Sequence, residues 1–210
     1  MAKMMGLLGK KMGMTRMYSA TGVAVAVTVI EAGPCVVLQK KTKAKEGYNA
    51  IQVGFGRKKE TRMNRAEIGH VKAAGQGGFY HIQEFRVTDP ESYQLGQKVG
   101  LADLLSVGDL VDVRARSKGR GFQGVVKRHG FRGGRATHGS MFHRAPGSIG
   151  CSAWPSRVVK GKKMPGHMGN QTTSKKNCMV IDVRPEQNVL VLKGGIPGAK
   201  QELIQIYKKS

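Results

Sequence analysis

The feature that most constrains this 210-residue chain is a stretch of 69 residues, 113–181, that contains no Asp or Glu. The stretch holds 15 Lys or Arg, 12 Gly and four of the six His, so it carries +15 of the formal net charge of +23. Charges of one sign repel each other and cannot be neutralised within the segment. Such a segment keeps a fixed shape only when an outside anion screens it, which predicts a polyanionic partner, most commonly a phosphate backbone.

Composition sets the limits for the rest of the chain. A hydrophobic content of 40% in 210 residues is enough for one domain with a real core, or two small ones. Thirty Gly and only 6% aromatic residues favour turns over long helices. A pI near 10.4 favours nucleic acid over membrane. Because no signal-peptide pattern and no apolar run of ~18 residues is found, we expect a cytoplasmic protein with no membrane partner. We also expect no small-molecule substrate and no cofactor.

Short β-branched runs separated by turn residues predict a mainly β fold. We expect the first two strands to be joined by a turn at Gly33-Pro34 and to begin an antiparallel meander. Within Arg57–Gly78 a weak helical pattern predicts one small helix. The expected strands are Gly22–Ile30, Cys35–Thr42, Asn49–Phe55, Tyr80–Val87, Leu110–Arg116, Met179–Arg184, Asn188–Lys193 and Leu203–Tyr207.

Closing six such strands into a small barrel would remove their exposed edges. We therefore predict one split β-barrel domain, residues 1–116 together with 176–210, in which 57–100 form a small inserted segment. Residues 117–175 are then a long irregular basic loop between two barrel strands. Loops beyond about 15 residues are uncommon in compact domains unless they are functional.

Three catalytic or cofactor patterns in the basic stretch fail on context. Gly119–Gly124 satisfies GxGxxG, but neither an amphipathic helix nor a ribose-binding acid follows it. The four His and Cys151 lack the tight, repeated spacing of zinc ligands, so we expect no metal. Pairing Ser140 with His143, or Cys151 with His167, leaves the base without an orienting acid. We therefore predict no enzyme activity.

Aromatic residues are interleaved with the basic ones in the same stretch, at Phe122, Phe131, Phe142 and Trp154. A flat ring on a Gly-rich, charged segment can stack on a base or a ribose. It can equally enter a local mini-core, and the sequence leaves both interpretations open. Separated Lys and Arg residues suit contact with many separate phosphates.

Ordered motifs run from one end of the chain to the other: Gly6–Arg16, Ser117–Lys127, Thr137–Ser140, His143-Arg144, Pro146–Gly150, Gly161–Pro165, Gly166–Gly169 and Lys193–Gly198. Together these motifs resemble the bacterial large-subunit ribosomal protein L3 family. The resemblance implies a six-stranded barrel like that of translation factors, and a central loop that penetrates large-subunit RNA toward the peptidyl-transferase centre. It also implies binding near the 3′ end of that RNA and a role in early assembly, beside neighbouring large-subunit proteins.

Basic, His and Trp side chains in and near these motifs are the expected rRNA contacts. Many relatives carry a methylated Gln directly after the GSIG motif, but here Cys151 follows it, so we expect no modification there. Trp154 should lie near the loop tip. The expected contacts are Lys10, Lys11, Arg16, Lys118, Arg120, Lys127, Arg128, Arg132, Arg135, His138, His143, Arg144, Trp154, Arg157, Lys160, Lys162, Lys163, His167, Lys175 and Lys176.

Two other functions remain open from the sequence. The chain could be a non-ribosomal nucleic-acid binder, such as a nucleoid or RNA-chaperone protein. An enzyme that acts on RNA is disfavoured, because the most basic region holds no carboxylate to bind a metal ion.

Overall fold

The computed structural model describes residues 6–209, and its chain divides into two compact units. Unit 1 contains the residues up to Arg116 and those from Thr172 onward, and unit 2 is Ser117–Gln171. Residues 1–5, the start of the segment in which we expect no signal peptide, lie outside the described part. The fold is mainly β, as predicted from the sequence.

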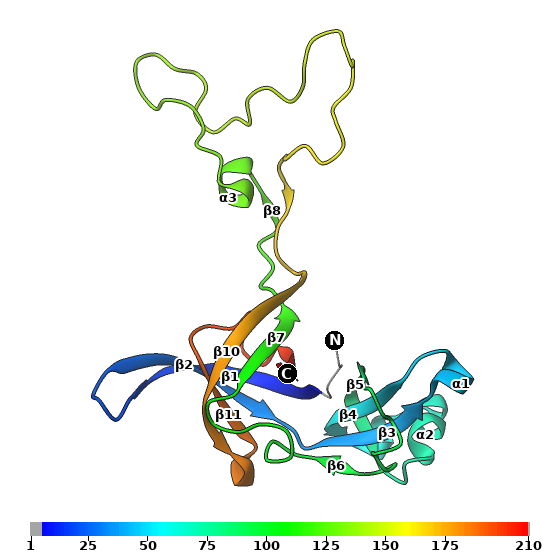
Figure 1. Cartoon of the computed structure of the whole chain (residues 1–210). Coiled ribbons are helices and arrows are strands. Elements are labelled where there is room, and N and C mark those ends of the chain that lie inside the picture. Colours follow the sequence, from blue (N-terminus) through cyan, green and yellow to red (C-terminus); the bar gives the residue numbers. More distant parts are fainter. Residues whose placement is uncertain (1–5, 210) are drawn as a thin grey trace. The chain divides into compact units, whose positions relative to one another are not determined.

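Six antiparallel strands of unit 1 form a closed barrel (Figure 1). The order is β1-β12-β7-β10-β11-β2, and β2 pairs back onto β1. Each of the six strands therefore pairs with a neighbour on both sides, so none of them is an edge strand. The strands are β1 (Gly6–Tyr18), β2 (Ala24–Ala32), β7 (Leu110–Arg116), β10 (Thr172–Arg184), β11 (Val189–Lys193) and β12 (Leu203–Lys208).

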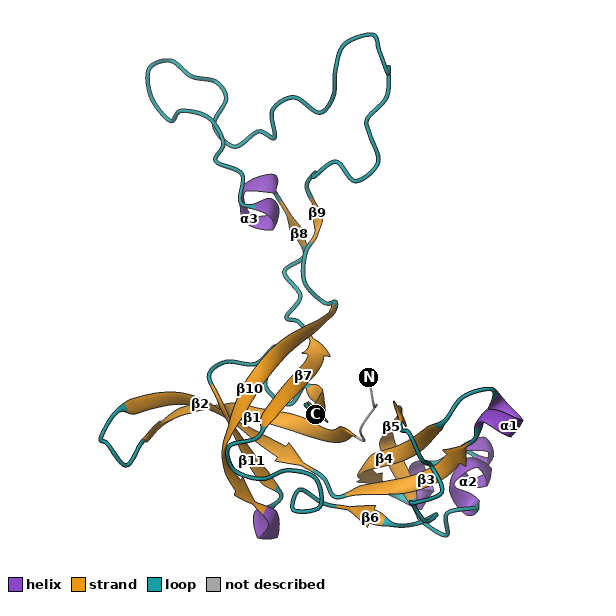
Figure 2. Cartoon of the chain, in the orientation of Figure 1, coloured by secondary structure: helices purple, strands orange, loops and turns teal. Residues whose placement is uncertain are grey.

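A second sheet in unit 1 has four strands in the order β5-β4-β3-β6 (Figure 2). The strands are β3 (Cys35–Lys41), β4 (Ala50–Lys58), β5 (Gly78–Arg86) and β6 (Lys98–Val99). The meander prediction is wrong at its start, because β2 and β3 belong to different sheets. Gly33, with φ +70°, lets the chain leave the barrel sharply after β2. The expected insertion 57–100 thus supplies only part of a sheet that begins at Cys35.

Short helices complete unit 1, and a third helix belongs to unit 2. The expected helix is α2 (Arg65–Lys72), which begins with a reciprocal capping box between Asn64 and Glu67. The Glu67 carboxylate also accepts from Lys58 Nζ at 2.8 Å, which ties the helix to β4. The remaining helices are α1 (Lys43–Glu46), α3 (Val125–His129) and the 3-10 turns Glu60–Arg62 and Pro185–Gln187.

Barrel and second sheet share one hydrophobic core. Leu7 and Ile30 from the barrel are fully buried in the same cluster as Val37 and Phe85 from the second sheet. Phe85 also meets Tyr207 of β12 edge to face, with ring centroids 5.3 Å apart. Each buried aliphatic or aromatic side chain contributes on the order of 1.5–3 kcal/mol. Because this core joins the sheets, unit 1 folds as one body.

Strand β1 was not predicted from the sequence, because its three glycines interrupt the apolar pattern. The structure gives the reason for two of them. A Cβ on Gly6 would collide with the Phe85 ring, and a Cβ on Gly9 would lie 2.6 Å from the Glu31 carbonyl oxygen. Glycine is therefore required where β1 approaches its neighbours closely.

Strand β10 also begins earlier than expected. Thr172–Lys175 pair with Val113–Arg116 of β7, so these residues are strand rather than loop. The boundary expected at 175/176 is moved back to Gln171, where unit 2 ends.

Candidate nucleic-acid interface

Unit 2 begins and ends as a narrow antiparallel ribbon. The Ser117 N–H donates to the Gln171 carbonyl at 2.9 Å, and the Arg120 N–H donates to the Met168 carbonyl at 2.9 Å. The ribbon continues as β8 (Phe122–Gln123) and β9 (Gly166–His167). Beyond these strands and α3, the rest of unit 2 is loop and turn (Figure 2).

One arginine of the expected interface joins the outgoing and returning arms of the ribbon. Arg128 of α3 donates from Nη1 to the Met164 carbonyl at 2.6 Å, and His129 Nε2 lies 3.0 Å from the same oxygen. A Cβ on Gly166 would lie 2.9 Å from Arg128 Nη1. Arg128 is half-buried here and holds the base of the loop together.

The distal loop is shaped by close backbone approaches instead of a core. The Gly134 N–H donates to the His143 carbonyl at 3.0 Å. A Cβ on Gly134 would collide with the Phe142 carbonyl, and Gly133 has a φ of +77° that disfavours other residues. His138, with φ 57°, is also in the left-handed region.

Val125 of α3 is the one buried residue of unit 2 among the described residues. Met141 is 97% exposed, Trp154 86% and Phe122 76%. A segment with so little buried apolar surface cannot offset the conformational entropy that it loses on ordering. Unit 2 also contains no acidic residue, so it forms no internal ion pair with Asp or Glu. Its fixed form needs contacts from another molecule.

The aromatic residues of unit 2 divide between the two interpretations left open. Phe131 is half-buried, with its ring centroid 6.1 Å from that of His129, so it belongs to a small local cluster. Phe142 is 42% exposed and packs near Gly147. Phe122 and Trp154 are exposed rings that remain open to a partner.

Most expected contact residues present their side chains to solvent. In unit 1, Lys10 and Lys175 are half-buried, and Lys175 donates to the Gly195 carbonyl at 2.6 Å. The exposed residues are Arg16, Lys118, Arg120, Lys127, Arg132, Arg135, His138, His143, Arg144, Trp154, Arg157, Lys160, Lys162, Lys163, His167 and Lys176.

Lys11 does not fit the prediction of an RNA contact. It is only 9% exposed, and its ammonium donates to the carbonyls of Ile196 at 2.8 Å and Gly198 at 3.1 Å. The two neighbouring lysines face opposite sides of β1, because successive side chains of a strand alternate. Lys11 is therefore a structural residue of the barrel, and Lys10 keeps its outward position.

Sequence reasoning missed Arg114, an exposed cation on β7. The sequence could have indicated this residue, because apolar and polar side chains alternate in LVDVRAR. Val111, Val113 and Ala115 are buried as the alternation predicts, which leaves Arg114 and Arg116 on the outer face.

Acidic residues of unit 1 neutralise part of its positive charge. Glu84 accepts from Lys41 Nζ at 2.6 Å and from the Tyr48 hydroxyl at 2.8 Å. These contacts, chiefly the one with Lys41, lower the pKa of the Glu84 carboxyl. Asp109 pairs in the same way with Lys208 at 2.7 Å. Unit 2 contains no acidic residue, so none of its cations can be paired in this way within the unit.

The cysteines are free, and their exposure differs. Burial raises the pKa of the Cys35 thiol to about 11, and it also raises that of Cys178. Cys151 is exposed. No group of three His, Cys, Asp or Glu side chains suited to a metal ion occurs within residues 6–209. Among the described helices, none is long and apolar enough to span a membrane.

Comparison with known proteins identifies the family. The family model described as ribosomal protein L3 matches residues 59–188. The large ribosomal subunit protein uL3 of Desulfotalea psychrophila is 59% identical over 209 residues, covering 100% of both chains. The chain belongs to the ribosomal protein L3 family. The uL3 proteins of Syntrophotalea carbinolica and Geobacter sulfurreducens are 51% and 53% identical, covering 97% and 96% of this chain and 97% and 95% of their own.

Members of the L3 family are structural components of the ribosome and not enzymes. The chain is accordingly a structural constituent of the large ribosomal subunit. The pairings of Ser140 with His143 and of Cys151 with His167 therefore need no catalytic explanation.

Proposed function

We propose that this L3 protein binds large-subunit rRNA directly near its 3′ end and helps to start assembly of the subunit. Unit 1 serves as a barrel of the translation-factor type, and unit 2 is a basic probe that enters the RNA toward the peptidyl-transferase centre. The protein works in the cytoplasmic ribosome, beside neighbouring large-subunit proteins. Peptide bond formation itself belongs to the RNA.

The observation that supports this proposal is that unit 2 lacks acidic residues and a core of its own, although both of its ends are attached to barrel strands. The unit has no acid and a single buried residue, yet its two ends leave adjacent strands, since Arg116 of β7 pairs with Thr172 of β10. A flexible tail would have one fixed end. A loop fixed at both ends has restricted freedom, so it loses less entropy when it orders on RNA.

Within unit 2 the proposed contacts have different roles. Exposed Arg and Lys side chains neutralise phosphates, and Arg adds planar bidentate contacts. Trp154 and Phe122 offer flat faces on which bases can stack, worth about 1–3 kcal/mol per base. Arg128 holds the two arms of the loop, so its contribution to binding is indirect. Cys151 stays unmodified.

Sucrose-gradient sedimentation of cell extract tests the ribosomal assignment. We expect one copy of the protein per large subunit, retained after a high-salt wash. A nucleoid or RNA-chaperone protein would instead sediment away from the subunit or at variable stoichiometry. Binding of the purified chain to a large-subunit RNA transcript and to duplex DNA of equal length gives the second test. Equal affinity for both, measured at one salt concentration, contradicts the proposed function.

A further inference from the structure

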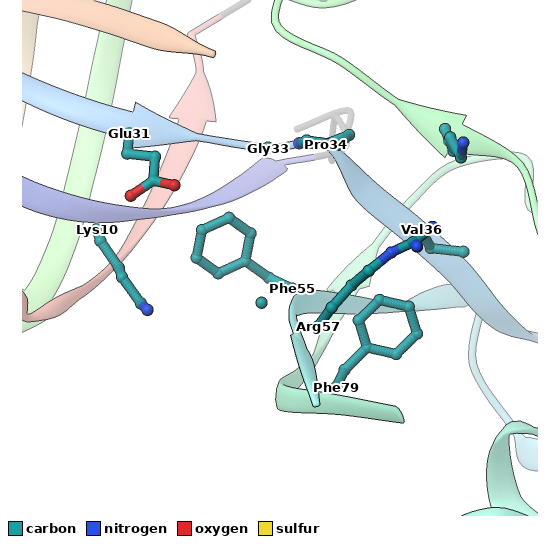
Figure 3. A pocket seen from close by; sticks show the side chains of 10 residues that line it. Lys10, Glu31, Gly33, Pro34, Val36, Phe55, Arg57 and Phe79 are labelled. Carbon is teal, nitrogen blue, oxygen red and sulfur yellow. The ribbon is translucent and has the colours of Figure 1, made fainter. Parts of the chain in front are cut away.

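Unit 1 contains a cleft of about 320 Å³ between the barrel and the second sheet. Figure 3 shows Lys10 and Glu31 on the barrel strands and Arg57 and Phe79 on the second sheet, with the Phe55 ring between the two groups. Lys98 of β6 also lines the cleft. All of these residues belong to unit 1, so the cleft is built independently of the loop unit.

The walls of the cleft carry three cations, Lys10, Arg57 and Lys98, against one carboxylate, Glu31. None of the ion pairs found within residues 6–209 involves any of these four groups. Elsewhere on the second sheet the lysines Lys41 and Lys58 are held by Glu84 and Glu67, respectively. The cleft is therefore a place where unit 1 leaves its positive charge uncompensated.

His81 provides a second sign of this uncompensated charge. Burial lowers the pKa of the His81 imidazole, and the positive charge of Lys10 lowers it further. Glu31, the cross-strand neighbour of Lys10, does not pair with it at hydrogen-bonding distance. An anion bound between Lys10 and the second sheet would relieve the repulsion between Lys10 and protonated His81.

The floor of the cleft is apolar, formed in part by Phe55 and Phe79, which are 4% and 8% exposed. Cations on two walls above an apolar floor suit a ligand that has an anionic group attached to a flat, uncharged body. A nucleotide of an RNA chain has this form, with its phosphate between the cations and its ribose or base against the floor. An acidic peptide supplies the charge but not the flat body.

We propose that this cleft is a second RNA site, which takes one or more backbone phosphates of the large-subunit RNA together with an attached nucleotide. The inference rests on the proposed function and extends RNA binding from unit 2 to unit 1. It adds Arg57 and Lys98 to the contact residues, and it gives Lys10 a defined place. Phosphate contacts in this cleft would fix the barrel on the RNA independently of the contacts that unit 2 makes.

The test uses the full chain and three triple variants. The cleft variant carries Lys10→Gln, Arg57→Gln and Lys98→Gln, and the charge-retaining variant carries Lys10→Arg, Arg57→Lys and Lys98→Arg. The matched control removes three exposed charges elsewhere in unit 1, by Lys43→Gln, Lys45→Gln and Lys72→Gln. Circular dichroism first verifies that each variant unfolds cooperatively, and the affinity for a large-subunit RNA transcript is then measured against salt concentration.

The plot of log Kobs against log salt has a negative slope, and each lost phosphate contact reduces its magnitude by about 0.7–0.9. We expect the magnitude of the slope to be smaller by about 2 in the cleft variant than in the parent chain. The charge-retaining and control variants should keep the slope of the parent chain. An unchanged slope in the cleft variant overturns the inference. An equal loss in cleft and control variants also overturns it, because total charge and not position would then explain the effect.

A poly-glutamate peptide is the alternative probe. If the cleft variant loses affinity for poly-glutamate while its RNA slope is unchanged, the cleft takes an acidic protein segment and the RNA inference is wrong. Failure of the proposed function gives a different result: the parent chain then binds duplex DNA as tightly as large-subunit RNA. A parent chain that prefers the RNA, beside a cleft variant with an unchanged slope, removes only the inference about the cleft.

Discussion

Replacing Lys118–Asn170 by a four-residue Gly/Ser linker should leave unit 1 folded and slightly more stable. The new ends suit a short connection, because the Ser117 N–H already donates to the Gln171 carbonyl at 2.9 Å. The core shared by the two sheets lies in unit 1, as does a smaller cluster that includes Leu38 of β3 and Val71 of α2, so the deletion removes no contact from either. Closing the 55-residue span of unit 2 costs more entropy than closing a four-residue turn. Each doubling of loop length costs about 0.6 kcal/mol, so nearly four doublings predict a gain of about 2 kcal/mol.

Urea unfolding followed by far-ultraviolet circular dichroism measures this change. The expected result is one cooperative transition with a higher midpoint than that of the full chain. The deletion must end before Gln171, because a deletion extended to Lys175 would remove the β10 residues that pair with β7. That longer deletion is the matched control and should be less stable. A loss of cooperative unfolding in the Lys118–Asn170 deletion would refute the division into a folded barrel unit and a dependent loop unit.

Three further predictions concern unit 1. Lys11→Met removes the donor to two barrel carbonyls and should lower the free energy of unfolding in urea by roughly 2 kcal/mol. Lys10→Met should change it by less than about 0.5 kcal/mol, and equal effects would contradict the opposite orientations of the two lysines. Gly6→Ala should destabilise by about 1–3 kcal/mol because a Cβ collides with core atoms, and Gly69→Ala, in open space on α2, should stabilise by up to about 1 kcal/mol in the same assay. The lowered pKa of Glu84 means that the unfolded state binds its proton first, so this stabilisation is present above the ordinary pKa of 4.5 and is lost as pH falls through the folded value. Thermal unfolding against pH should show Glu84→Gln losing up to about 1 kcal/mol at neutral pH and progressively less as the pH falls below 4.5, and a pH-independent loss would exclude the ion pair as its cause.

Local patterns were sufficient to predict most of the strands and the small helix. Alternation in Leu110–Arg116 predicted the strand, and the structure buries its apolar face. Asp112 and Asp182 marked the ends of the acid-free stretch, and both lie on barrel strands that flank unit 2. These features depend on neighbours within a few residues, which is the range over which sequence patterns act.

Features that depend on distant residues could not be predicted. The glycines of β1 weaken the strand pattern, and only the packed Phe85 ring explains why Gly6 is required. Strands β2 and β3 belong to two different sheets that share one core. The local pattern of two strands joined by a turn does not distinguish this arrangement from a meander. Lys10 and Lys11 look equivalent in the sequence, and their different roles depend on carbonyls almost 190 positions away. The cleft cations Arg57 and Lys98 escaped notice because no local pattern joins them.

The most direct test of the central claim uses Cys151 of unit 2 as a chemical probe. Because Cys35 and Cys178 are buried, an iron chelate with a thiol-reactive arm should attach selectively to this exposed cysteine. Large subunits reconstituted with the labelled chain are then treated to release hydroxyl radicals, and RNA cleavage is mapped by primer extension. We predict strong cleavage confined to nucleotides around the peptidyl-transferase centre, and none with a Cys151→Ser chain. Full incorporation of the labelled chain without cleavage there would contradict the claim that unit 2 enters the large-subunit RNA toward that centre.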